Sequence, residues 1–171
     1  MPAIFLARYL GLSGPTYCVS TACTSSAKAL VSARNLLRQG LCDALLVGGV
    51  DSLCKLTMNG FAALEATSPE ICNPISRNRR GINIGEAAAV FIMSREEADI
   101  QLLGAGESSD AYHMSAPQPE GLGAEAAMRA ALADAGCAPG GVDYLNMHAT
   151  ATAKNSTMIR PSARPVGEGG V

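Results

Sequence analysis

Apolar and polar positions alternate along the chain in two different periods, which divide it into expected helices and strands. Apolar residues recur at steps of three and four across residues 27–41, which predicts a helix with Gly40 as its stop. A short β-type run at residues 16–20 precedes this helix, and a second run at 44–47 follows it and ends on two glycines. A strand, a helix and a strand in this order predict a βαβ unit.

The same patterns predict further elements on both sides of this unit. We expect further helices at residues 3–10, at 59–65 and from 117–123 to about 135, with a helical turn at 94–97. We expect further strands at residues 87–93, 100–107 and 142–147. Helices and strands that alternate in this way predict an α/β fold.

Composition excludes several classes of protein. The chain has 171 residues, enough for one ordinary domain. A net charge of -2 gives no indication of a nucleic-acid partner. The apolar N-terminal segment is short and interrupted by Arg8, so we expect neither a signal peptide nor a membrane span. The six cysteines have no metal-type spacing to His113 or His148, so we expect no metal site and reduced thiols in a cytoplasmic protein.

A glycine pattern at residues 121–126 formally fits a relaxed dinucleotide fingerprint. Prolines precede it and no strand does, so we reject that interpretation and expect no cofactor.

Cys23 stands at the corner between the strand expected at residues 16–20 and the helix that follows. The first N–H groups of a helix lack helical partners and carry a partial positive charge, which favours a thiolate. A cysteine there is suited to nucleophilic chemistry at neutral pH, and the same N–H groups are suited to binding the oxyanion of an acyl carbonyl. The alternative is a small buried cysteine that packs a tight corner.

The segment around Cys23, VSTACTSSAKAL, resembles the nucleophile segment of β-ketoacyl-acyl-carrier-protein synthases, the elongating condensing enzymes of bacterial fatty-acid and polyketide synthesis. Further segments resemble the same family in the same order: LLVGGVDSL, NGFAAL, SRNRRGINIGEAAAVFIMSREEA, SSDAYHM and YLNMHATAT. The resemblance covers residues 16–154 approximately. It implies a thiolase-like α/β fold, layered α/β/α, with parts of two duplicated βαβαβ halves.

The resemblance also implies how the chain is divided. Residues 1–98 would be the remainder of the N-terminal thiolase-like half, which holds the nucleophile, and residues 99–154 the start of the C-terminal half. Residues 155–171 resemble no part of the family, have prolines and glycines without an apolar period, and are expected to be a disordered tail. We therefore expect a family member truncated at both ends, through a frameshift or as a gene fragment.

Roles for particular residues follow from the resemblance. Cys23 would accept the acyl group, and His148 would polarise the malonyl carbonyl, because its segment is similar to the family's N.HGTST motif. Thr150 and Thr152 belong to the same motif and would support it. Glu86 is a candidate buried carboxylate that matches a glutamate near the family's active site. The alternative is a carboxylate at a strand end that caps neighbouring backbone.

The implied reaction is a decarboxylative Claisen condensation of malonyl-carrier protein with the acyl group on Cys23. The implied partners are acyl carrier protein, loaded with acyl or malonyl groups, and a second copy of the chain in a homodimer. The family's second catalytic histidine and its lysine have no counterparts here. Loss of one oxyanion donor costs about a hundred- to a thousand-fold in rate. We therefore expect an impaired fragment with little or no condensation activity alone.

Some features depart from the family or leave alternatives open. Ala149 replaces a glycine, and residues 80–82 read Arg-Gly-Ile in place of Asp-Gly-Phe, which leaves the acyl-chain preference open. The arginines at 77, 79 and 80 form either a solvated face or a surface that steers an acidic carrier protein. The segment NRRGINIGEAAA resembles the corresponding segment of synthases of aryl polyene assembly. A non-catalytic carrier-protein-binding fragment, or a decayed one, stays the alternative function.

Overall fold

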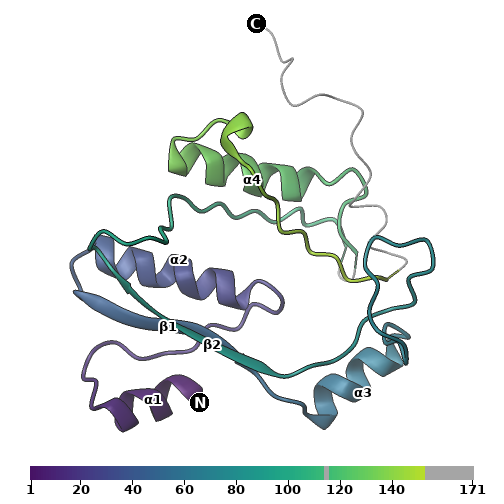
Figure 1. The fold of residues 1–171 in the computed structure, drawn as a ribbon, viewed down its shortest axis with the longest axis horizontal. Coiled ribbons are helices and arrows are strands. Elements are labelled where there is room, and N and C mark those ends of the chain that lie inside the picture. Colours follow the sequence, from purple (N-terminus) through teal and green to yellow (C-terminus); the bar gives the residue numbers. More distant parts are fainter. Residues whose placement is uncertain (114–115, 153–171) are drawn as a thin grey trace, which may run out of the picture. The chain divides into compact units, whose positions relative to one another are not determined.

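The computed structural model describes residues 1–113 and 116–152. Helices and strands of the described residues follow one another along the chain as shown in Figure 1. They are α1 (Pro2–Leu10), α2 (Ser25–Arg38), β1 (Ala44–Asp51), α3 (Lys55–Ala63), β2 (Ala87–Ser94), α4 (Leu122–Ala135) and a 3₁₀ helix (Pro139–Gly141). The chain divides into two compact units. The first joins residues 1–54 and 85–101, and the second joins residues 55–84 with the described residues from 102 onward.

The first unit is built around a two-stranded antiparallel sheet. β1 pairs with β2 in a register that places Ala44 opposite Ser94 and Asp51 opposite Ala87. Helix α2 lies along this sheet and contacts both strands (Figure 1). The buried apolar residues of the unit come from this contact, and they are Ala33, Leu37 and Val47. Burial of these side chains fixes α2 on the sheet, and with it the N-terminus of α2.

Two adjacent glycines in β1 permit close approach of neighbouring segments. A Cβ added to Gly48 would overlap the carbonyl oxygen of Ala89 on β2. A Cβ added to Gly49 would lie 2.5 Å from the Oγ of Ser26 in the first turn of α2. The glycine pair after residues 44–47 therefore lets the start of α2 pack directly against β1.

Small residues also determine the packing of the second unit. An extended segment at residues 102–108 runs along α4 (Figure 1). A Cβ added to Gly104 would lie 2.6 Å from the backbone nitrogen of Ala135, so only glycine fits there without a shift. The Ala105 N–H donates a hydrogen bond to the Asp134 carboxylate at 2.9 Å. The extended backbone of residues 102–108 and helix α4 are thus held close together.

The predicted helices are present, and glycine stops account for their ends. Gly11 after α1 and Gly136 after α4 have left-handed φ values of 67° and 64°. Gly40 has φ 69° and lies two residues beyond Arg38, the last residue of α2. Only residues with low cost at positive φ terminate helices in this way. The helix predicted at 59–65 is α3, which begins and ends earlier than predicted.

The strand predictions are correct in two places and wrong in three. The runs at 44–47 and 87–93 lie in β1 and β2. Residues 16–20, 100–107 and 142–147 form no strand in the described part of the chain. The βαβ prediction is therefore wrong, and the pairing that exists is antiparallel. An apolar run indicates which side chains prefer burial, but a strand also needs a neighbouring backbone with which to pair.

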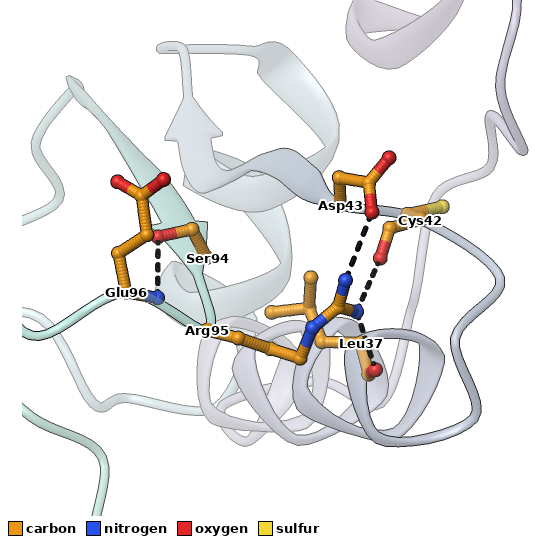
Figure 2. A network of polar contacts seen from close by, with 6 residues as sticks. All are labelled: Leu37, Cys42, Asp43, Ser94, Arg95 and Glu96. Carbon is orange, nitrogen blue, oxygen red and sulfur yellow. Dashed lines mark hydrogen bonds and ion pairs between the residues drawn. The ribbon is translucent and has the colours of Figure 1, made fainter.

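The predicted helical turn at 94–97 is absent: Ser94 ends β2 and residues 95 and 96 form a bend, because their polar groups are used elsewhere (Figure 2). The Ser94 hydroxyl accepts the Glu96 N–H at 3.2 Å. The Arg95 guanidinium donates to the carbonyl oxygens of Leu37 and Cys42, each at 2.9 Å. It also pairs with the Asp43 carboxylate at 2.8 Å. Arg95 therefore links the end of α2 to the segment that follows β2.

Candidate active site

Cys23 lies in a tight turn that leads directly into α2. Ala22, the residue before it, has φ 54°, a left-handed conformation that is uncommon for a residue with a side chain. The Thr24 N–H donates to the Thr21 carbonyl at 3.3 Å, and the Ser25 N–H donates to the Ala22 carbonyl at 3.1 Å. The chain thus reverses at Ala22 and presents Cys23 at the helix entrance. Strained backbone of this kind is typical of functional sites.

Two hydroxyl groups hold this turn in place. The Ser25 hydroxyl accepts the Thr21 N–H at 2.9 Å and donates to the Ala22 carbonyl at 2.6 Å. The Thr24 hydroxyl donates to the Thr21 carbonyl at 2.8 Å. These bonds satisfy the polar backbone of the turn without using the Cys23 side chain. Sequence reasoning missed both roles, although Ser and Thr at a helix start are a signal for such bonds.

The Cys23 side chain is exposed, so the alternative of a buried packing cysteine is wrong. The expected use of helix N–H groups as oxyanion donors stays a prediction, and it does not extend easily to the first two N–H groups after Cys23. The N–H groups of Thr24 and Ser25 already bond to carbonyls of the turn. An oxyanion at Cys23 therefore requires other N–H groups, because a donor engaged in the turn would have to give up its bond.

Glu86 lies in the same compact unit as Cys23, immediately before β2. Its carboxylate accepts the N–H of Leu53, just beyond the end of β1, at 3.1 Å. The residue is exposed, so the expectation of a buried carboxylate is wrong. The alternative is confirmed: Glu86 caps backbone at a strand end and ties together the two chain segments at that end of the sheet.

His148 lies at the centre of a γ-turn in the second compact unit, because the Ala149 N–H donates to the Met147 carbonyl at 2.9 Å. The hydroxyls of Thr150 and Thr152 share a hydrogen bond of 3.0 Å. The imidazole is at an exposed position. His148, Thr150 and Thr152 therefore lie in one loop, and their roles stay predictions.

The neighbouring arginines 79 and 80 of the basic run make different contacts. Half-buried Arg79 donates from Nε to the Thr152 carbonyl at 3.3 Å and from Nη1 to the Ser76 carbonyl at 2.8 Å. Exposed Arg80 pairs with the Glu70 carboxylate at 3.0 Å. A solvated face therefore describes Arg80 but not Arg79. Sequence reasoning missed the structural role of Arg79, because bonds to backbone carbonyls leave no residue pattern.

Among residues 1–113 and 116–152, no cluster of three or more His, Cys, Asp and Glu side chains is arranged to hold a metal ion. The helices in that part of the chain are all too short or too polar to cross a bilayer. The predicted tail at residues 155–171 lies outside the described residues.

Comparison with known proteins shows the family of the chain. The family model "Beta-ketoacyl synthase, N-terminal domain" matches residues 1–98, and "Beta-ketoacyl synthase, C-terminal domain" matches residues 100–158. The chain therefore belongs to the β-ketoacyl synthase family, whose members act in fatty-acid and polyketide synthesis.

Curated relatives agree with this assignment. Nodulation protein E of Rhizobium meliloti is 39% identical over 155 residues, which are 85% of this chain and 38% of that protein. The 3-oxoacyl-[acyl-carrier-protein] synthase 2 of Staphylococcus aureus is 35% identical over 157 residues, 84% of this chain and 39% of that enzyme. The chain thus spans less than two fifths of the length of these relatives.

A solved structure supports the fold. The ketosynthase ApeO, in complex with its chain length factor ApeC from Xenorhabdus doucetiae, matches with a TM-score of 0.88 and 50% identity. The match covers 92% of this chain and 39% of that one. The predicted thiolase-like α/β class is therefore confirmed.

Proposed function

We propose that Cys23 is the acyl-accepting nucleophile of a β-ketoacyl-acyl-carrier-protein synthase, and that the whole protein performs a decarboxylative Claisen condensation. The observation that carries the proposal is the exposed Cys23 thiol in a strained turn at the N-terminus of α2. Membership of the β-ketoacyl synthase family supports it. The side chain is accessible to a thioester, and the helix end supplies a positive potential for a thiolate.

The first half-reaction transfers an acyl group to Cys23. The thiolate attacks the carbonyl carbon of an acyl thioester, and an oxyanion forms on the carbonyl oxygen. When the oxyanion collapses, the bond to the carrier sulfur breaks, and the carrier leaves as a thiolate that takes up a proton. The hydrogen bonds of Ser25 keep the turn in the conformation that presents the thiol.

The second half-reaction uses a malonyl thioester. Its carboxylate leaves as carbon dioxide, and the electron pair of the broken C–C bond moves toward the thioester carbonyl oxygen. The resulting enolate carbon attacks the acyl carbon on Cys23, and the Cys23 thiolate is released. We assign to His148 the hydrogen bond that stabilises the enolate oxygen, and to Thr150 and Thr152 the support of its loop.

His113, the other histidine of the sequence, belongs to the SSDAYHM segment, and we assign it a structural role. We therefore propose that this chain alone accepts an acyl group on Cys23 but condenses it slowly with the malonyl group. The reason is that it has one polarising imidazole, whereas the family's reaction uses two. We also keep the division into residues 1–98 and 99–154 as a proposal. The limits of the two family matches, 1–98 and 100–158, support it.

The proposed acyl donor is an acyl carrier protein, which the name of the Staphylococcus aureus relative includes. We also propose that the whole protein pairs with a second ketosynthase-type subunit, most simply a copy of itself. The ketosynthase ApeO forms a complex with its chain length factor, which supports pairing of this general kind. The aryl polyene subclass and the cytoplasmic location stay predictions.

The test is to incubate the chain with octanoyl-acyl-carrier protein and to map added acyl groups by mass spectrometry. We expect one octanoyl group, on the peptide that contains Cys23, and its loss in Cys23→Ala. Cys18→Ala is the matched control, because Cys18 is also exposed and lies five positions earlier. An unmodified Cys23, or equal acylation of Cys18, would contradict the proposal. That result would favour a non-catalytic or decayed fragment.

A further inference from the structure

The loop that contains His148 is held by a segment 73 residues earlier in the chain. Two successive carbonyl groups of the loop are bound by this segment. The Ala151 carbonyl accepts the Gly81 N–H at 3.0 Å, and the Thr152 carbonyl accepts the Arg79 Nε–H at 3.3 Å. Both belong to the second compact unit. The two bonds fix the chain three and four residues after His148.

The conformation of the loop requires such support. Ala151 has φ 53°, in the left-handed region, and only 1% of its surface is exposed. A residue with a side chain adopts that region only at an energetic cost. The γ-turn at His148 lies in the same loop, three residues before Ala151. Such backbone persists only where surrounding contacts select it.

The supporting segment is itself rigidly bound. Arg79 is braced by the Ser76 carbonyl at 2.8 Å. Ile82 exchanges backbone bonds with the chain before it: its N–H donates to the Ala66 carbonyl at 2.8 Å, and its carbonyl accepts the Ser68 N–H at 2.9 Å. Buried Gly81 has φ 122°, and a Cβ there would lie 2.5 Å from the Ala66 carbonyl oxygen. The segment therefore offers a fixed template for the loop.

We propose that Arg79 is a positioning residue for His148, which it orients by binding the Thr152 carbonyl and so selecting the strained loop conformation. The catalytic role of His148 in this inference rests on the proposed function. The structural effect does not: removal of the guanidinium frees the loop and changes the environment of the His148 imidazole.

The experiment measures the modification of His148 and His113 by diethylpyrocarbonate at pH 7, with each site quantified by mass spectrometry. Variants are Arg79→Gln, which removes the cation, and Arg79→Lys, which retains one. Arg80→Gln is the matched control, because Arg80 lies next to Arg79 but binds exposed Glu70. His113 serves as an internal reference in every sample.

We expect Arg79→Gln to change the rate of His148 modification by about three- to tenfold and to leave the His113 rate unchanged. A factor of this size corresponds to the contribution of one hydrogen bond to a conformational equilibrium. Arg79→Lys should restore part of the parent rate, and Arg80→Gln should match the parent at both sites. An unchanged His148 rate in Arg79→Gln overturns the proposal. If Arg79→Gln instead changes the rates of both histidines through unfolding, Arg79→Lys decides: a parent-like fold with no His148-specific change also overturns the proposal.

The two proposals fail separately. Absence of acyl transfer to Cys23 contradicts the proposed function, but it leaves a specific effect of Arg79 on His148 in place. A normal acylation of Cys23 with no effect of Arg79→Gln on His148 contradicts only the positioning role.

Discussion

The hydroxyl of Ser25 accepts the backbone N–H of Thr21 at 2.9 Å and thereby closes the turn that presents Cys23. The same hydroxyl donates its hydrogen to the Ala22 carbonyl at 2.6 Å, so one side chain satisfies both a donor and an acceptor of the turn. Ala22 has φ 54°, and the turn therefore depends on side-chain bonds more than an ordinary helix start does.

Ser25→Ala should lower the free energy of unfolding by about 1 kcal/mol and slow acylation of Cys23 by up to about tenfold. The reason is that the turn loses both bonds and presents the thiol less often. Urea unfolding and the acyl-transfer assay measure the two effects. Ser32→Ala is the control within α2, because its hydroxyl bonds to the Tyr17 hydroxyl at 2.8 Å, away from the turn. Equal acylation rates for the two variants would contradict the role of Ser25.

Arg95→Gln should destabilise the chain by about 1 kcal/mol, because the guanidinium satisfies the carbonyls of Leu37 and Cys42 near the end of α2 (Figure 2). Arg129→Gln removes an exposed pair with Glu125 within one helix and should cost only about 0.3–0.5 kcal/mol. Urea unfolding of both variants compares them directly. The interpretation fails if Arg129→Gln proves the more damaging of the two.

The pKa of Asp110 is held below its ordinary value, first by the Gln118 N–H at 2.9 Å and second by the Tyr112 N–H at 3.1 Å. A lowered pKa in the folded state means that the ionised form is favoured by folding. The resulting stabilisation is present at neutral pH and is lost as the pH falls from about 5 through the folded value.

Asp110→Asn should therefore lose less stability than the parent between pH 7 and about pH 3, measured by urea unfolding at each pH. Asp143→Asn is the control, because it removes a carboxylate of the same charge at another exposed position of the same unit. Identical acid sensitivity of Asp110→Asn and the parent would show that folding does not favour the ionised form of Asp110.

The sequence was sufficient for the helices and insufficient for the sheet. Apolar spacing and the stops at Gly11 and Gly136 are local signals, and α1 and α4 end where those glycines stand. The strands expected at 16–20 and 142–147 do not form in the described part of the chain, because strand formation depends on a partner backbone that a local pattern does not reveal.

The site shows the same division between local and distant causes. The position of Cys23 just before a helix could be predicted, since it follows from residues next to it in sequence, although the strand expected before it does not form. The exposure of Glu86 and its bond to Leu53 depend on how β1 and β2 pair. The bond from Arg79 to the Thr152 carbonyl joins residues far apart in sequence, and a backbone acceptor carries no residue identity that a pattern could show.

The most direct test of the central claim is protection of Cys23 from iodoacetamide at pH 7, with all six cysteines mapped by mass spectrometry. Cys18 is the internal reference, because both thiols are exposed. We predict that Cys23 reacts faster than Cys18, and that prior incubation with octanoyl-acyl-carrier protein protects Cys23 alone. Equal alkylation of the two thiols, with no protection by the acyl donor, would contradict the assignment of Cys23 as the acyl-accepting nucleophile.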